Sequence, residues 1–220
     1  MRILVLLSLT VLFSSFAADP NSPLELASYK EKVKIACVGD SITAGPYPGQ
    51  LQKLLGEKFM VKNFGNSGST LLKHGDKPYD KQKSYTDALA FKGDAVVIML
   101  GTNDTKPQNW GKHKDEFVAD YKALLAEFAK AENKPRIFVA TPPFVPGKGN
   151  YGINEAGVLE ELPMIEALAK EAGVGIIDQH AATKDKDELF PDRVHPNAAG
   201  AGVLASTVYK ALLGKAPEGK

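Results

Sequence analysis

Cysteine is nearly absent from this chain, since Cys37 is the only one among its 220 residues. A disulfide within the chain is therefore impossible, and the core must hold the fold unaided even in an oxidising compartment. This excludes the small secreted scaffolds that depend on cross-links. Cys37 lies within an apolar run, so we expect it to be a small buried side chain.

Net charge is nearly absent as well. The chain has 27 Lys and Arg residues against 26 Asp and Glu, and one of the basic residues is Arg2. Without the first 17 residues the count is 27 − 1 = 26 basic residues against 26 acidic ones, a formal charge of zero. Such a chain has no long-range field to attract nucleic acid or an anionic membrane, so we expect neither as a partner.

Long hydrophobic runs are also missing, with one exception at the N-terminus. Ile3–Phe16 is apolar apart from Ser and Thr, follows Arg2, and leads into Ala17 and Ala18. This pattern is typical of a cleavable secretory signal peptide, with cleavage after Ala17 as the first choice and after Ala18 as the second. The run is too short to span a bilayer comfortably, which disfavours an uncleaved anchor. We therefore predict a secreted or periplasmic protein with no stable membrane insertion.

The remaining chain is long enough for one domain with a full core. We interpret residues 1–17 as the signal peptide and the polar residues 18–32 as a lead-in to the domain. Residues 33–213 form the predicted domain, and residues 214–220 form a C-terminal tail.

Apolar runs and helical spacing alternate along the domain. The runs predicted to form strands are Val33–Val38, Phe59–Phe64, Asp94–Leu100, Pro135–Ala140 and Val174–Ile177. Apolar residues recur at helical spacing after Pro48, which predicts a helix there. The other predicted helices are Ser84–Phe91, Lys112–Lys130, Asn154–Ala172 and Asn197–Leu212. Pro163 is expected to kink residues 154–172 or to start a second helix there. This alternation predicts right-handed crossovers and a five-stranded parallel sheet in a three-layer α/β/α sandwich.

Four polar clusters follow predicted strands or precede the last predicted helix. They are Gly39-Asp40-Ser41, Asn66-Ser67-Gly68, Gly101-Thr102-Asn103-Asp104 and Asp192-Arg193-Val194-His195. All strands of a parallel sheet end at the same edge, so the first three clusters should meet there. The fourth can reach that edge because the helix after it must pack back on the sheet.

The chemistry of these clusters is complementary. Ser41 supplies a hydroxyl, His195 is a base that titrates near neutral pH, and Asp192 lies one turn before His195 and can orient it. The backbone N–H groups of Ser41 and Gly68 and the amide of Asn103 are candidate donors to an oxyanion. Each residue alone also has a structural interpretation, as a turn or a helix cap. Their joint presence favours nucleophilic catalysis.

Two points of this assignment stay open at the level of sequence. Asp178 ends a predicted strand and could orient His195 in place of Asp192. Asp40 is expected to support the turn through backbone hydrogen bonds and not to react.

The four clusters resemble blocks I, II, III and V of the SGNH, or GDSL-type, hydrolases, in the same order and over nearly all of the chain from Val33 to about Leu212. The resemblance maps the family's Ser, Gly, Asn and His onto Ser41, Gly68, Asn103 and His195, and its block V aspartate onto Asp192. It implies a flavodoxin-like sandwich and an esterase that uses no cofactor. The chain is also similar to bacterial esterases that remove acetyl groups from sugars, including sialate O-acetylesterase-like proteins.

The loops predicted to surround this site are polar. Leu72–Lys83 and Thr102–His113 are rich in charge and offer almost no apolar surface to a fatty chain. We therefore expect a short acyl group, most simply acetyl, on a small-molecule or glycan alcohol. Trp110 or Tyr151 could stack on a sugar, although each could instead anchor its own loop. The alternatives are a lysophospholipase or thioesterase of the same family and a non-enzymatic carbohydrate-binding protein.

The other histidines show no spacing typical of metal ligands. His74, His113 and His180 lie far apart in the sequence, so we predict no metal site. The sequence does not predict an oligomeric state.

Overall fold

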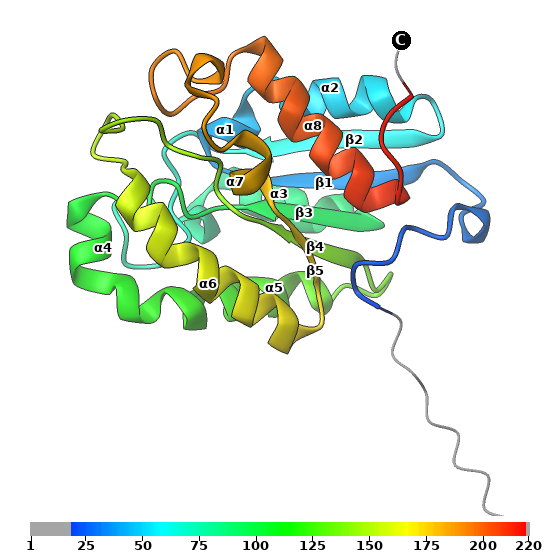
Figure 1. Cartoon of the computed structure of the whole chain (residues 1–220). Coiled ribbons are helices and arrows are strands. Elements are labelled where there is room, and N and C mark those ends of the chain that lie inside the picture. The colour runs from blue at the N-terminus through cyan, green and yellow to red at the C-terminus, as the bar shows by residue number, and fades with distance from the viewer. Residues whose placement is uncertain (1–18, 219–220) are drawn as a thin grey trace, which may run out of the picture.

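Five parallel strands form one sheet at the centre of the computed structural model, which describes residues 19–218 (Figure 1). The strands are β1 (Val33–Gly39), β2 (Phe59–Gly65), β3 (Ala95–Met99), β4 (Arg136–Ala140) and β5 (Gly175–Ile177). Their order is β2-β1-β3-β4-β5. This is the flavodoxin-like order, in which ligands bind where the chain changes direction between β1 and β3. The prediction of a five-stranded parallel α/β sandwich is confirmed.

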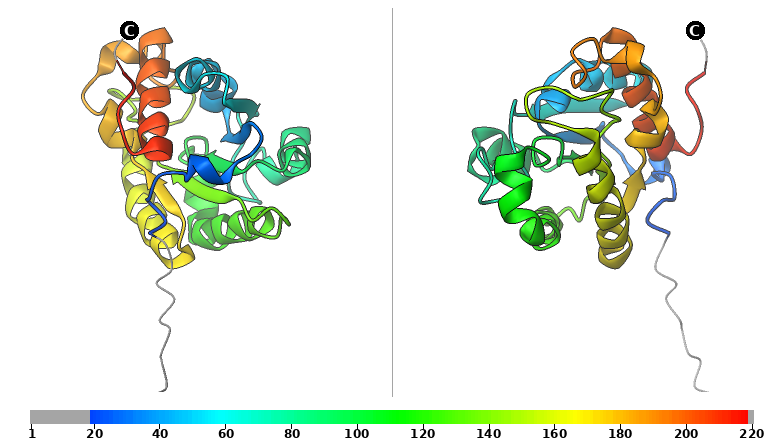
Figure 2. Two further views of the ribbon diagram at one scale, coloured as in Figure 1. Left: turned by 90° about the vertical axis from the view of Figure 1, so that its right-hand side faces the viewer. Right: turned by 60° about the vertical axis from the view of Figure 1, so that its left-hand side comes forward.

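Helices cover both faces of the sheet (Figures 1 and 2). They are α1 (Ser41–Ala44), α2 (Tyr47–Leu55), α3 (Lys83–Phe91), α4 (Pro107–His113), α5 (Phe117–Ala129), α6 (Glu155–Ala172), α7 (Gln179–Thr183) and α8 (Ala198–Leu213). Alternate residues of β1 serve the two faces: Ile35 and Cys37 pack with α2 and α8, whereas Val38 packs with α3, α5 and α6. Because both faces of β1 and β3 are covered, these strands read as nearly continuous apolar runs.

The lead-in to the domain is packed and not free. Leu24 is buried, and its backbone N–H donates to the carbonyl of Leu212 at the end of α8, at 2.8 Å. The Arg136 guanidinium at the start of β4 donates to the carbonyls of Pro20 and Ser22. The proposed signal peptide, residues 1–17, lies outside the described residues. Within residues 19–218, no helix has both the length and the apolar content needed to cross a membrane.

One helix prediction needs correction. Residues 112–130 do not form one helix: α4 begins earlier, at Pro107, and a short 3-10 turn over Lys114–Glu116 separates it from α5. Pro107 is the signal that was missed, because proline is favoured at the first helical position.

Of the two outcomes expected at Pro163, a kink or a second helix, the second does not occur. The helix α6 runs unbroken from Glu155 to Ala172 through it. Proline leaves the carbonyl four residues earlier, that of Leu159, without its helical partner.

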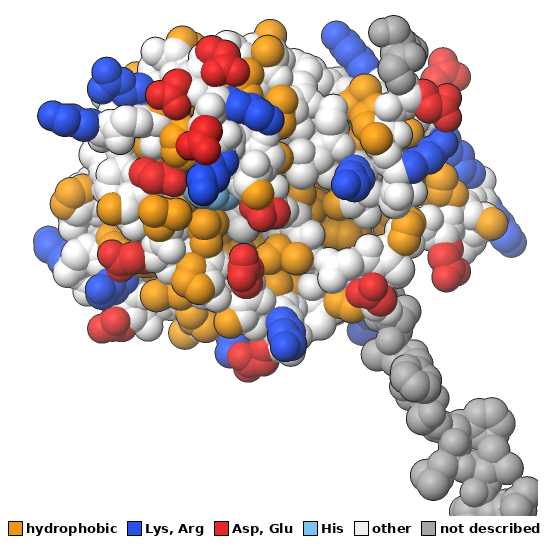
Figure 3. All heavy atoms as spheres, in the orientation of Figure 1, with side chains coloured by type: hydrophobic (Ala, Val, Ile, Leu, Met, Phe, Trp, Pro, Cys, Tyr) orange, Lys and Arg blue, Asp and Glu red, His pale blue; other side chains and the backbone are white. Residues whose placement is uncertain are grey.

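Charged side chains of both signs are interspersed over the surface drawn in Figure 3. This agrees with the formal net charge of +1 for the whole chain. The face therefore presents no extended patch of one sign to a charged partner.

Candidate active site

The chain bends sharply at the carboxyl end of β1. Gly39 has no room for a side chain, since a Cβ there would lie 2.2 Å from Thr43 Oγ1 and 2.4 Å from the carbonyl oxygen of Met99. Asp40 caps α1 by accepting a hydrogen bond of 2.9 Å from the backbone N–H of Ile42. This turn presents Ser41 at the first position of α1, just outside the sheet. Asp40 thus makes the backbone bond expected from the sequence.

The structure brings Ser41, His195 and Asp192 together. Ser41 Oγ lies 2.8 Å from His195 Nε2, and His195 Nδ1 lies 2.7 Å from Asp192 Oδ2. The other carboxylate oxygen, Oδ1, accepts the backbone N–H groups of Val194 at 3.0 Å and His195 at 2.7 Å. These bonds fold residues 192–195 into one turn, which holds the carboxylate and the imidazole in register.

The pKa values of Asp192 and Asp40 are shifted in opposite directions. Burial raises the pKa of Asp192, but hydrogen bonds from the His195 ring and from the backbone outweigh it, so the pKa of Asp192 is lowered overall. Burial dominates at Asp40 and raises its pKa to about 6. The carboxylate beside the imidazole is therefore held ionised more firmly than that of Asp40.

Asp178, the alternative partner of His195, has another place in the structure. Its Oδ1 accepts the backbone N–H of Ala181 at 2.8 Å and the hydroxyl of Thr141 at 3.4 Å. Asp178 is thus the N-cap of α7. The carboxylate that accepts from the His195 ring is that of Asp192.

Gly68 and Asn103 follow β2 and β3, the two neighbours of β1. Gly68 has φ of +79°, a conformation that favours glycine, and a Cβ there would meet only Lys77 Cδ, at 3.8 Å. Asn103 is buried, and its side-chain amide donates to Asp40 Oδ2 at 3.3 Å. Asn109 donates to the carbonyl of Asn103 at 3.0 Å. The Asn103 amide is therefore held beside the turn that carries Ser41.

Asp104 has a role that the sequence did not reveal. Its buried carboxylate accepts the backbone N–H groups of Leu71 at 2.9 Å and Leu72 at 2.7 Å. Burial raises the pKa of Asp104 to about 7 despite these bonds. The residue next to Asn103 thus ties the loop that follows Gly68 to the loop after β3. Its adjacency to Asn103 was the only signal.

The two aromatic candidates are placed very differently. Tyr151 is 59% exposed, its hydroxyl donates to Asp192 Oδ2 at 3.4 Å, and its ring centre lies 5.9 Å from that of His195. Trp110 is 7% exposed, packs edge-on against Phe117, and donates its indole N–H to Glu160 at 2.9 Å. The expectation that Trp110 stacks on a sugar is therefore not supported, because its faces lie in the core.

A hollow of about 570 Å³ lies next to residues 192–195. Its walls are two segments, and the residues that line it are Pro146, Gly147, Lys148, Asp187, Glu188, Phe190, Pro191 and Arg193. Four of these side chains are charged, so this space beside Arg193 suits a polar molecule better than a fatty chain.

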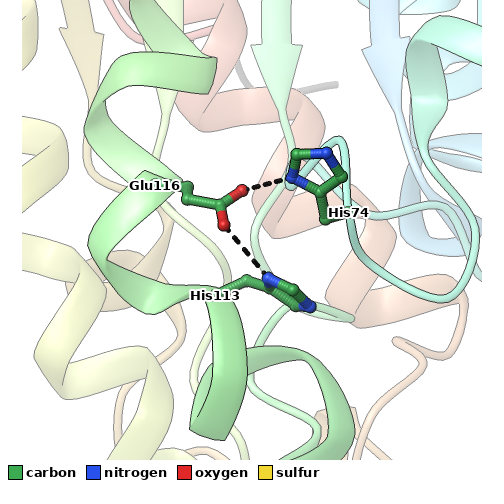
Figure 4. A group of neighbouring side chains, drawn as sticks. All are labelled: His74, His113 and Glu116. Carbon is green, nitrogen blue, oxygen red and sulfur yellow. Dashed lines mark hydrogen bonds and ion pairs between the residues drawn. The ribbon is translucent and has the colours of Figure 1, made fainter.

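Two histidines that lie far apart in the sequence, His74 and His113, meet at one carboxylate in the structure. His74 Nδ1 lies 2.6 Å from Glu116 Oε2, and His113 Nδ1 lies 3.1 Å from Glu116 Oε1 (Figure 4). These three side chains offer ligand atoms within 4.8 Å of one another and could hold a metal ion. His180 is buried and pairs instead with Glu155, at 2.7 Å.

Comparison with known proteins gives a consistent assignment. Residues 37–203 match the model of the GDSL-like Lipase/Acylhydrolase family. An acetylxylan esterase from Xylanibacter ruminicola is 38% identical over an alignment of 215 residues, and the match covers 84% of this chain and 44% of that protein. The chain therefore spans less than half the length of the curated relative it matches.

Solved structures share the fold. The M. smegmatis aryl esterase has a TM-score of 0.63 and 24% identity, with 81% of this chain and 99% of that chain covered. A carbohydrate acetylesterase from Sinorhizobium meliloti has a TM-score of 0.63 and 22% identity, with 80% and 96% covered.

Proposed function

We propose that this chain, which belongs to the GDSL-like lipase/acylhydrolase family, is a serine esterase that removes acetyl groups from carbohydrate. The observation that carries the proposal is the hydrogen-bonded series Ser41–His195–Asp192. A nucleophile, a base and a carboxylate that orients the base are the parts that acyl transfer needs. A carbohydrate-binding protein would have no use for this series.

In the proposed mechanism, Ser41 Oγ attacks the ester carbonyl while His195 Nε2 takes its proton. The negative charge that develops on the carbonyl oxygen is stabilised by the N–H groups of Ser41 and Gly68 and by the Asn103 amide. The alcohol leaves with the proton from His195, and acetyl-Ser41 remains. Water then attacks this ester by the same route and releases acetate. Asp192 stays ionised throughout and stabilises the imidazolium.

The substrate proposal rests on the surroundings of this series. Tyr151 is exposed beside His195 and offers a face on which a sugar could stack. The hollow lined by Arg193 also carries Lys148 and Asp187; all three side chains can bind hydroxyl groups, and the two basic ones can bind a carboxylate. The acetylxylan esterase of X. ruminicola adds support through its name, and it makes acetylated xylan the first substrate to test. A polymeric carbohydrate substrate also fits the secreted or periplasmic location that we propose.

The decisive experiment compares acyl length and alcohol. We expect acetate release from acetylated xylan and the highest kcat/KM for acetyl in a chain-length series of p-nitrophenyl esters. Each CH₂ buried in an apolar channel is worth about 0.8 kcal/mol, so a lysophospholipase or thioesterase should instead favour long chains. A preference for eight or more acyl carbons, with no acetate from any sugar, would replace our proposal with that alternative. No hydrolysis of any ester would favour a binding protein.

A matched pair of variants tests the role of Tyr151. Tyr151→Phe keeps the ring and removes the hydroxyl, whereas Tyr151→Ala removes both. If the ring stacks on sugar, Tyr151→Ala raises KM for acetylated xylan by about 10-fold, and Tyr151→Phe retains most of the affinity. Equal values of KM for both variants and the unaltered chain would assign the ring to anchoring its loop.

A further inference from the structure

Two histidines and one glutamate converge at the surface between α4 and the loop before α3. His74 comes from that loop, His113 is the last residue of α4, and Glu116 lies in the turn that leads to α5. Each oxygen of the one carboxylate faces an imidazole Nδ1, at 2.6 Å for His74 and 3.1 Å for His113 (Figure 4). We propose that these three side chains form a binding site for one Zn²⁺ ion, separate from the Ser41 site.

The separations suit a tetrahedral ion. Zinc lies about 2.0–2.1 Å from nitrogen or oxygen ligands, so two ligands on one ion are roughly 3.3 Å apart. The Nδ1–oxygen distances are 2.6 Å and 3.1 Å, and all ligand atoms lie within 4.8 Å. Small side-chain rotations would therefore admit an ion in place of the two hydrogen bonds. Each imidazole would then bind through its unprotonated Nδ1 and carry its proton on Nε2.

The donor set selects the kind of metal. Imidazole nitrogen suits zinc and its neighbours in the transition series, whereas calcium and magnesium prefer oxygen ligands. Two imidazoles and one carboxylate are a ligand set that zinc uses in proteins, with the fourth position left to water. Water can reach this position, because the side chains of His74 and Glu116 are 70% and 39% exposed.

The backbone around His74 is fixed before any ion binds. On one side, the N–H of Lys73 donates to Asp120 of α5 at 2.8 Å. On the other, Asp76 exchanges two hydrogen bonds with Asn109 of α4, at 2.9 Å and 3.1 Å. Because the ligands need little reordering, less of the binding free energy is spent on ordering them. The ion would clamp the loop that follows Gly68 onto the start of α5.

The test is zinc binding by the full chain, purified without a histidine tag. We expect calorimetry with ZnCl₂ to give one equivalent bound. We also expect Tm to rise by roughly 5–10 °C at a zinc concentration 100 times Kd. CaCl₂ and MgCl₂ should produce neither effect. Absence of stoichiometric zinc binding would overturn the proposal.

Two variants show which histidines bind the zinc ion. His74→Ala changes an exposed side chain and should fold, yet should weaken zinc binding by about 10-fold or more. His195→Ala is the matched control, because it removes the other accessible histidine–carboxylate pair and should leave zinc binding unchanged. Zinc X-ray absorption should report two imidazole nitrogens in the unaltered chain. Zinc affinity that survives His74→Ala and falls in His195→Ala would move the ion to the Ser41 site and refute our assignment.

Discussion

Two histidine–carboxylate pairs in this molecule have the same length and different surroundings. His195 pairs with Asp192 and His180 pairs with Glu155, each at 2.7 Å. The side chains of the first pair are 39% and 33% exposed, and the second nitrogen of His195 faces Ser41 Oγ. Those of the second pair are 7% and 20% exposed. A short bond between imidazole and carboxylate therefore does not identify a catalytic base.

The second pair holds the loop after β4 in place. Glu155 Oε1 meets His180, and its Oε2 accepts the backbone N–H of Val145 at 2.9 Å. Thr183, one turn after His180, accepts the N–H of Phe144 at 3.0 Å. This loop continues to Tyr151, which lies against His195. One pair thus positions a wall of the site at which the other pair is proposed to react.

The largest expected difference is between variants that lack His195, the proposed base, and variants that lack His180, which holds a loop. His195→Ala should lower kcat by about 10⁴-fold or more, because it removes the base that activates Ser41. His180→Ala should leave kcat within about 10-fold and lower the free energy of unfolding by about 1–3 kcal/mol, because Glu155 loses a buried partner. Steady-state kinetics and urea unfolding measure the two effects. Comparable losses of kcat in the two variants would remove the distinction between the pairs.

The carboxylates allow the next largest comparison. Asp192→Asn should reduce kcat by about 10³- to 10⁴-fold, because an amide does not stabilise the imidazolium and holds the ring in the wrong tautomer. Asp178→Asn is the control, since asparagine also caps helices and Asp178 caps α7. If Asp178→Asn is the more damaging of the two changes, Asp178 orients the base and our assignment of Asp192 is wrong.

A variant of Asn103 tests whether its amide stabilises the negative charge that develops during the reaction. Asn103→Ala should lower kcat by about 10²- to 10³-fold with little change in KM, because the amide is proposed to bind an oxyanion present only in the transition state. Circular dichroism and Tm provide the control for folding, since Asn103 is buried and bonded to Asp40. An effect confined to KM would assign the amide to substrate positioning.

Glu161 contrasts with both histidine–carboxylate pairs, because its buried carboxyl group has no hydrogen-bond partner among the described residues. Neither of its oxygens has a hydrogen-bond partner within residues 19–218, and a Cβ on Gly101 would lie 2.3 Å from Oε2. Burial, and to a smaller extent the nearby Asp104 and Asp40, raises the pKa of Glu161 well above its usual 4.5. The folded state therefore holds this proton more tightly than the unfolded state does. Stability from this group is complete below pH 4.5 and falls as the pH rises above it.

Glu161→Gln should remove that pH dependence. Between pH 5 and pH 8, the free energy of unfolding of the unaltered chain should fall more steeply than that of the variant. The difference in slope can reach about 1.4 kcal/mol per pH unit, the value for one proton. Urea unfolding across this pH range measures both slopes. Parallel slopes would mean that Glu161 is ionised in the folded chain.

The features that sequence predicted well depend on local pattern and on sheet topology. The turn from β1 into Ser41 and the spacing of Asp192 and His195 are both local. Gly68 and Asn103 could be placed at the same edge because parallel strands end together. The fold class followed from the alternation of apolar runs and helical spacing.

The features that sequence missed depend on how the long loop after β2 folds. That loop brings His74 to Glu116, 42 residues away, and Leu71 to Asp104, 33 residues away. Neither contact follows from periodicity, because an irregular loop has no repeating geometry. The choice between sugar stacking and loop anchoring for Trp110 stayed open for a related reason, since it depends on α4, which begins at Pro107 and turns the indole toward Glu160.

The central claim is that Ser41 is the nucleophile activated by His195. Its most direct test is covalent labelling with a phosphonate that reacts with activated serines, followed by mass spectrometry of the digested protein. Our account predicts one equivalent of label on the peptide that carries Ser41, slow labelling of His195→Ala and none of Ser41→Ala. Full labelling of a correctly folded Ser41→Ala variant would contradict it.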